Sequence, residues 1–249
     1  MTNNLASGPG SNVTNLNTLN SAISGYGDLY NPSNELITLV ALKALYVSGL
    51  SAVDAVDDVQ PANTNAKNAR TDRFDLLSKL STRIGNAFKS IISNKAAREH
   101  VRSMVLIIQR GRVNPKKDPP PVTDPNGDPI IDKENASHQS GYDKQLENFN
   151  KLIKYLASFP NYIPNEADLT VGSLSDFYDE LSAKNQLVTD TQVQLNRARA
   201  VRKTVIDNPE TGVVSLGMAS KNYISSVFGP KSPEYKQISK LKFRVYKPK

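Results

Sequence analysis

The chain has 249 residues, 38% of them hydrophobic, and its 31 Lys and Arg exceed its 24 Asp and Glu, which gives a net charge of +7. It contains no cysteine, which excludes disulfides, thiolate nucleophiles and cysteine-ligated metals. No stretch approaches the roughly 20 apolar residues of a membrane-spanning helix, and the polar start lacks the pattern of a secretory signal. We therefore expect a cytoplasmic protein without a membrane span.

The first half of the chain predicts helices throughout. A short helix is expected over residues 13–24, and a long one follows from Ser33, which we interpret as its N-cap. The apolar positions of the long helix recur at three and four residues: Leu39, Leu42, Tyr46, Leu50, Val53 and Val56. Pro61 has no backbone donor, so it should kink or break this helix near Gln60. Two amphipathic helices, 72–92 and 95–109, complete the half.

The middle of the chain has the composition of a linker. Residues 113–141 hold six prolines and two glycines, which favour extended or turn-rich backbone. Alternatively, the DPNGDP sequence forms a hairpin turn on the surface, anchored by Ile130 and Ile131. Its acidic residues lack the spacing and the closing Glu of a calcium-binding loop.

The second half again predicts helices. They are expected over 143–158, over a long stretch near 166–206, and over 213–228. Asp207 to Gly212 should form a tight turn that has no counterpart between Arg73 and Phe74. We expect Ser232 and Pro233 to begin a short helical turn, followed by a basic tail docked on the protein.

A weak internal repeat relates the two halves. At an offset of 132 residues the chain matches itself at Tyr30/Tyr162, Pro32/Pro164, Thr38/Thr170, Leu42/Leu174, Tyr46/Tyr178, Ala66/Ala198 and Arg70/Arg202. Each half also runs from an acidic front to a basic rear: residues 1–60 and 142–194 each carry −4, and residues 61–118 and 195–249 each carry +9. The sequence therefore predicts an all-α tandem duplication of an antiparallel helical bundle, with one long spine helix per repeat. The predicted domains are repeat 1 (1–112), the linker (113–141) and repeat 2 (142–249).

Patterns of catalytic chemistry are scarce. The two histidines, His100 and His138, are too few for a histidine metal site or a Ser-His-Asp arrangement within one repeat, and phosphate-binding glycine motifs are absent. Acidic residues at helical spacing could bind metal, but a solvated acidic face is the favoured interpretation: Asp54, Asp57 and Asp58, and Asp176, Asp179 and Glu180. We expect no enzymatic activity, no cofactor and no metal.

Clusters of basic residues are the strongest candidates for a functional surface. The candidate polyanion-binding residues are Lys67, Arg70, Arg73, Arg197, Arg199, Arg202, Lys203, Lys236, Lys240, Lys242 and Arg244. Further basic runs are Arg110, Arg112, Lys116 and Lys117, and Lys247 and Lys249 at the end of the chain. Tyr235, Phe243 and Tyr246 lie among them and could stack on single-stranded bases.

Two internal explanations compete with this functional interpretation. The acidic front of each repeat could neutralise its own basic rear or that of its twin, and this is the favoured alternative. Some of the same residues could instead form a polar layer between helices, made by Asn63, Asn68 and Arg70 with Asn196 and Arg202.

The C-terminal segment resembles a group of uncharacterised bacterial helical proteins. The shared pattern consists of Phe228-Gly229, Ser232-Pro233, Tyr235-Lys236 and Lys242-Phe243, within a resemblance over residues 142–249. It implies a helical fold and a bacterial origin, and it carries no activity. We predict a structural or protein-interaction (scaffold or assembly) protein that associates with a protein partner or itself. The alternative is a nucleic-acid-binding protein that uses the basic rear helices.

Overall fold

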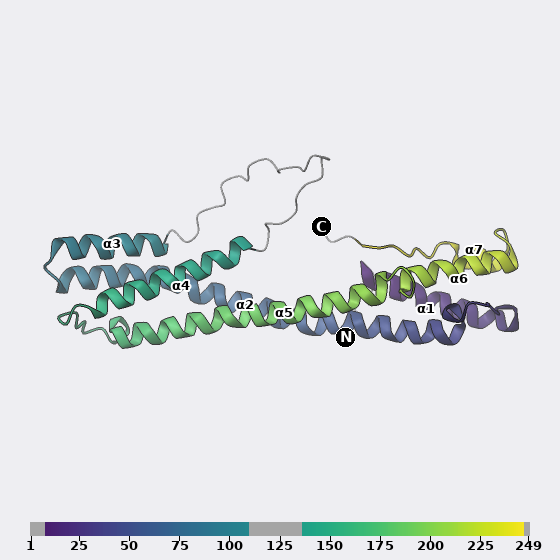
Figure 1. Ribbon diagram of the computed structural model, residues 1–249, viewed down its shortest axis with the longest axis horizontal. Coiled ribbons are helices and arrows are strands. Elements are labelled where there is room, and N and C mark those ends of the chain that lie inside the picture. The colour runs from purple at the N-terminus through teal and green to yellow at the C-terminus, as the bar shows by residue number, and fades with distance from the viewer. Residues whose placement is uncertain (1–7, 110–135, 247–249) are drawn as a thin grey trace, which may run out of the picture. The chain divides into compact units, whose positions relative to one another are not determined.

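The computed structural model describes residues 8–109 and 136–246, with the side chains of 136–140 left out, and this part contains helices and no strand (Figure 1). The α-helices are α1 (Pro9–Tyr26), α2 (Leu39–Ile91), α3 (Lys95–Gln109), α4 (Ala136–Ala157), α5 (Val171–Asp207), α6 (Val213–Phe228) and α7 (Pro233–Ser239). Three single 3₁₀ turns accompany them: η1 (Gly27–Leu29), η2 (Glu35–Ile37) and η3 (Ala167–Leu169). The predicted all-α class is therefore confirmed.

The helices form two compact units, and each unit contains segments of both halves of the chain. Unit 1 consists of Met1–Asn63 and Thr191–Lys249, and unit 2 consists of Thr64–Asp190. These boundaries differ from the predicted division at 113–141, because α2 and α5 each contribute residues to both units. Most of the predicted linker lies outside the described residues, and its last six residues, 136–141, are the start of α4.

Unit 1 has a core in which α1 is the most buried element. Its apolar residues meet residues of α2, α5, α6, α7 and the C-terminal tail, which we define as residues 240–246. The core includes Val13, Leu16, Leu19, Ile23, Leu42, Val53, Ile206, Val213, Leu216, Ile224, Ile238 and Phe243. A helix closed on several sides by other helices is the arrangement of a small bundle.

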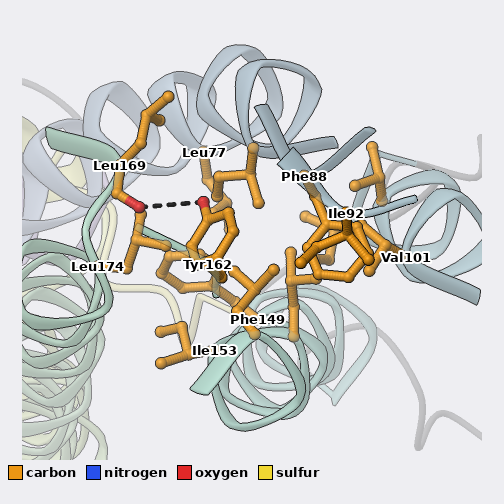
Figure 2. Close-up of a cluster of buried hydrophobic side chains, with 14 of the residues drawn as sticks. Leu77, Phe88, Ile92, Val101, Phe149, Ile153, Tyr162, Leu169 and Leu174 are labelled. Atoms are coloured by element: carbon orange, nitrogen blue, oxygen red, sulfur yellow. Dashed lines mark hydrogen bonds between the residues drawn. The ribbon is translucent and has the colours of Figure 1, made fainter. Parts of the chain in front are cut away.

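Unit 2 has a more aromatic core, built by α3, α4, the second part of α2 and the first part of α5 (Figure 2). Phe88 on α2 is fully buried, and its ring centre lies 5.1 Å from that of Phe159 and 5.8 Å from that of Tyr162. Aromatic pairs in these geometries add to the stabilisation that comes from burying their area.

Two turns, one in each unit, share a hydrogen-bond pattern at an offset of 132 residues. Tyr30 Oη donates to the Ile37 carbonyl at 2.7 Å, and Tyr162 Oη donates to the Leu169 carbonyl at 3.0 Å (Figure 2). The hydroxyl of the following threonine then accepts a backbone N–H of the next helix at 3.3 Å, in Thr38 as in Thr170. Burial raises the pKa of Tyr162 to about 12 and also raises that of Tyr30.

The predicted start of the first long helix at Ser33 is wrong. Asn34 begins η2 instead, because its Oδ1 accepts the Leu36 N–H at 3.0 Å. The chain then leaves η2 at Thr38, and α2 starts at Leu39. The cap of α2 is therefore Thr38, whose hydroxyl oxygen accepts the Ala41 N–H, rather than Ser33.

A predicted break at Pro61 is also wrong, since α2 continues through it as a single helix of 53 residues that includes the predicted helix 72–92. Pro61 is exposed, so water can satisfy the carbonyl that the proline leaves without a donor. The predicted helices 95–109 and 213–228 are confirmed at both ends.

The predicted turn after the second long helix is confirmed. Helix α5 ends at Asp207, and Asn208 Oδ1 accepts the N–H groups of Glu210 at 2.8 Å and Thr211 at 3.0 Å. A Cβ atom on Gly212 would lie 2.5 Å from the Asn208 carbonyl oxygen, so the turn requires glycine there. The same place in α2 is uninterrupted helix.

Helix α2 contains a stretch that is long and apolar enough to cross a membrane, and 28% of that stretch is buried in the protein. The buried part includes Leu42, Val53 and Val56. Core helices of soluble proteins pass the same test of length and composition. The absence of a membrane span therefore stays a prediction.

Candidate polyanion interface

The structure separates the candidate polyanion-binding residues into two groups. Lys67, Arg70 and Arg73 belong to unit 2. The others belong to unit 1 and lie on α5, on α7 and in the tail: Arg197, Arg199, Arg202, Lys203, Lys236, Lys240, Lys242 and Arg244.

Arg70 is an internal residue. It is 6% exposed, its Nη1 donates to Asn185 Oδ1 at 2.9 Å, and its guanidinium lies 4.1 Å from the centre of the Tyr142 ring. Burial lowers its pKa, while Tyr142 and Asp143 act in the opposite direction. A side chain in this position cannot meet an external phosphate, so assigning Arg70 to a polyanion site is wrong.

Arg73 is also engaged within unit 2. Its guanidinium forms an ion pair with Glu180 on α5 and lies 4.9 Å from the centre of the Phe177 ring. Lys67 is exposed and has an interaction of its own. Arg70 and Arg73 therefore serve helix packing, and the ion pair of Arg73 with Glu180 is one instance of the predicted neutralisation.

The predicted polar layer exists in part, with other partners. In unit 1, Asn63 Nδ2 donates to Thr191 Oγ1 at 3.2 Å, and in unit 2 Arg70 donates to Asn185. Asn196 instead accepts a hydrogen bond from Gln192 on its own helix at 2.9 Å. Asn63 and Arg70 therefore join α2 to α5 through Thr191 and Asn185, rather than through Asn196 and Arg202.

Two residues of the predicted acidic cluster on α5, Asp176 and Glu180, line a surface groove of about 520 Å³ in unit 2. Arg73 with Glu180, and Arg83 with Asp168, pair across this groove, and the hydrogen bond from Arg83 lowers the pKa of Asp168. Asp168 and Glu180 are thus paired with arginines, and no group of three His, Cys, Asp or Glu side chains that could hold a metal ion occurs in the described part of the chain. His100 is an exposed residue of α3 whose ring lies 4.6 Å from that of Tyr155, and the side chain of His138 lies outside the described residues.

The basic tail of unit 1 is held in place through its backbone. Asn12 on α1 donates from Nδ2 to the Arg244 carbonyl at 2.7 Å and accepts the Arg244 N–H on Oδ1 at 3.0 Å. Asn15 Nδ2 donates to the Lys242 carbonyl at 2.8 Å, and Lys221 Nζ donates to the carbonyl groups of Leu241 at 2.6 Å and Ser239 at 3.0 Å. The predicted docking of the tail is confirmed.

Phe243 fixes the direction of the tail side chains. It is 8% exposed and packs over Gly217 on α6, where a Cβ atom would come within 2.6 Å of its ring. Lys242 and Arg244, the residues on either side, are exposed. The tail therefore buries one aromatic ring and presents the neighbouring cations to solvent. The preceding helix α7 is begun by Ser232, whose Oγ accepts the Tyr235 N–H at 3.0 Å.

The cations of α7 and the tail have no carboxylate partner among the residues that the structure describes. Lys236, Lys240, Lys242 and Arg244 are exposed and form no ion pair within residues 8–109 and 136–246. Helix α1, whose asparagines hold the tail, contains no charged residue. The favoured hypothesis of internal neutralisation therefore does not describe this surface.

The rest of the predicted basic surface lies on α5 and beyond. Arg197, Arg199 and Lys203 are exposed, and Arg202 is half-buried. The runs at 110–117 and at 247–249 lie outside the described residues.

The aromatic residues of the tail do not form the predicted stacking platform. Phe243 is part of the core of unit 1, and Tyr235 is packed against the same core. Tyr246 is partly exposed, and its hydroxyl lies 2.9 Å from Ser11 Oγ. Two of the three rings are therefore unable to stack on bases.

Sequence reasoning missed Asn12, Asn15 and Gly217 as the residues that position the tail. The signal that could have found them is the composition of α1, which has four asparagines and no charged residue. No protein-family model, curated protein or solved structure matches the chain. The resemblance of residues 142–249 to bacterial helical proteins therefore stays a prediction.

Proposed function

We propose that the protein is a non-enzymatic structural or interaction protein, built from two copies of a helical repeat, which associates with a second copy of itself. The proposed contact is an exposed surface of unit 1, called the α2 face below, formed by Leu36 of η2 and by Val40, Ala44, Val47, Ser48 and Ser51 of α2.

The shared local structure of the two halves supports a duplication. The turns before α2 and α5 have the same tyrosine and threonine hydrogen bonds at an offset of 132 residues. The last helix of each half is begun by a side-chain cap: Asn94 accepts the Ala97 N–H and Ser232 accepts the Tyr235 N–H, each at 3.0 Å. Such detail is difficult to reach twice by chance in otherwise diverged sequences.

The α2 face is unusually apolar for an exposed surface. Val40 is 80% exposed, Val47 is 63% exposed and Leu36 is 46% exposed. Between Leu36 and Val53 the only charged residue is Lys43. The outer face of a surface helix normally carries charged residues, and a continuous apolar patch on a surface marks an interaction site.

The second repeat provides an internal comparison, and this is the observation that carries the proposal. At an offset of 132 residues, Leu36, Ala44, Val47 and Ser48 correspond to Asp168, Asp176, Asp179 and Glu180. These acidic residues have solvent-accessible side chains, and two of them pair with arginines. Equivalent positions are thus charged in one repeat and uncharged in the other, so folding of the repeat does not require the apolar choice.

A second copy of the chain is the occupant that this chemistry favours. The α2 face itself contains no charged residue that would bind an acidic or basic partner, and the exposed Lys43 lies beside it on the helix. The face is complementary to itself across a two-fold axis. Ala44, Ser48 and Ser51 are small and exposed, so another helix can approach closely.

Light scattering of the purified full chain tests this proposal. We expect concentration-dependent self-association that changes little between about 50 and 200 mM salt, since apolar contacts are not screened as charges are. Val47→Asp introduces the residue type found at the corresponding position, Asp179, and should weaken self-association at least tenfold. Ile107→Asp, at a position on α3 that is 51% exposed, is the matched control and should leave it unchanged.

Two results of this experiment would contradict the proposal. A monomer at all concentrations, or equal effects of Val47→Asp and Ile107→Asp, would overturn self-association through the α2 face. Because α2 meets the length and composition of a membrane span, neutral lipid vesicles form a second arm. Binding of a monomer to those vesicles, abolished by Val47→Asp, would assign the face to lipid instead.

A further inference from the structure

The geometry points to a nucleic-acid-binding surface on unit 1, formed by Lys236 of α7 with Lys240, Lys242 and Arg244 of the tail, which contacts the phosphate backbone without reading base sequence. This site is independent of the α2 face.

The spacing of the four cations suits a repeating row of phosphates. Lys236 and Lys240 are one helical turn apart, ~6 Å along the axis at 1.5 Å per residue. Lys242 and Arg244 flank a buried residue, as in extended chain, where residues two apart are separated by ~6.7 Å. Phosphates of one DNA strand follow each other at ~3.4 Å along the duplex axis, so every second phosphate lies at a similar interval.

The backbone of the row is held by several hydrogen bonds, and one of the donors is the ammonium group of Lys221. Asn12 and Asn15 hold the backbone of Lys242 and Arg244, and Phe243 anchors the segment between them in the core. The side chains of the cations are not used by these contacts. Since α1 carries no carboxylate, the positive potential of the row is not cancelled by the helix beneath it. The one acidic residue of α7, Glu234, is half-buried.

Recognition of the backbone, rather than of the bases, follows from the position of the aromatic rings. Phe243 and Tyr235 are packed in unit 1, so only Tyr246 of these three rings is exposed, and one ring is no platform for successive unpaired bases. Contacts made by Lys and Arg to phosphates carry no sequence information by themselves. The expected ligand is therefore a nucleic acid of any sequence.

Fluorescence anisotropy with a labelled 20-nucleotide duplex tests the site in the full chain. For four phosphate contacts, the logarithm of the binding constant should fall with the logarithm of salt concentration with a slope of about −3 to −4. The variant K236Q/K240Q/K242Q/R244Q should bind at least tenfold more weakly and lose most of this slope. A second variant, K236R/K240R/K242R, keeps the charge and should bind as the unchanged chain does.

A control with the same loss of charge separates a local site from general attraction. K89Q/K95Q/R102Q/K154Q removes four exposed cations of unit 2 and should change affinity by less than twofold. Equal losses in both quadruple variants, a salt-independent affinity, or no binding by the unchanged chain would overturn the site. Labelled polyglutamate bound as tightly as the duplex would do so too.

The outcome is distinguishable from that of self-association. Val47→Asp should bind the duplex normally even as a monomer, and the tail variant should associate normally without nucleic acid. Circular dichroism and thermal unfolding confirm that each variant is folded, which is expected because the substituted side chains are exposed.

Discussion

Single side chains decide how the tail lies on unit 1. The ring of Phe243 occupies the space that a side chain on Gly217 would need, and Asn12 satisfies both backbone groups of Arg244. A small residue beneath a large one is a common way to seat an aromatic anchor, since protein interiors are close-packed. The glycine is thus a requirement of the tail rather than of the helix α6 that contains it.

Gly217→Ala should release the tail. The new Cβ atom would come within 2.6 Å of the Phe243 ring, so the ring must leave its position. We expect faster amide hydrogen exchange at 241–246, with the rest of α6 and α1 little affected. Gly25→Ala on α1 has no atom within 4 Å of the new group and is the control. Unchanged exchange in Gly217→Ala would show that the tail is not held there.

The two tyrosines of the turns should contribute similar free energies of unfolding. Tyr30→Phe and Tyr162→Phe each remove one hydroxyl donor to a carbonyl, at a cost of about 1 kcal/mol each. Urea unfolding measures both. A large effect of one and none of the other would contradict the equivalence of the turns.

Tyr162 should also make stability depend on pH. Its pKa in the folded protein is about 12, above the ordinary value of 10, so the folded state holds the phenolic proton more tightly. The stabilisation is complete below pH 10 and is lost as the pH rises through 12. The stability difference between the unchanged chain and Tyr162→Phe should therefore narrow between pH 9 and pH 11.5. A difference that does not change with pH would contradict this.

At the scale of elements, the two long helices show what sequence patterns could and could not predict. Periodicity identified the buried faces of the α2 and α5 segments, and Asn208 with Gly212 identified the turn that ends α5. The prediction placed the start of α2 at Ser33, whereas Thr38 caps the helix, and both residue types can serve as caps. The periodic pattern also could not predict that the helix would continue through Pro61, since helix packing on both sides of the proline outweighs the local free-energy cost of a proline in a helix.

Pro61→Ala should stabilise the protein. A proline within a helix costs up to about 3 kcal/mol relative to alanine, and Pro61 is exposed, so alanine loses no buried contact. We expect a gain of about 1–3 kcal/mol in the free energy of unfolding. The matched control is Pro233→Ala: Pro233 lies at the start of α7, where proline is well accommodated, so no gain is expected. Destabilisation by Pro61→Ala would indicate that the proline shapes α2 for packing.

At the scale of the whole molecule, the units and the repeats do not coincide. Unit 1 contains α1 and the start of α2 from the first half of the chain, and α6, α7 and the end of α5 from the second half. Unit 2 contains α3 and the end of α2 from the first half, and α4 and the start of α5 from the second half. The sequence pattern predicted apolar faces but not which of these faces meet, since periodicity describes a face and not its partner. The burial of Arg70 could not be predicted for the same reason, because its hydrogen-bond partner Asn185 lies 115 residues away in the sequence.

This arrangement makes each half dependent on the other. Fragments 1–112 and 136–249, prepared separately, each lack part of both cores and should be poorly folded. Mixed together, they should form a complex with the helical content of the intact chain, as circular dichroism measures. Two fragments that fold independently, without binding each other, would contradict the division into units 1 and 2.

The two hydrogen bonds between Asn12 and the main chain of Arg244 have a consequence for the evolution of the protein. Since the tail is held through its peptide groups and the ring of Phe243, the side chains at positions 242 and 244 can change while the tail stays docked. New specificities can therefore arise there by single substitutions, while the supporting framework stays the same.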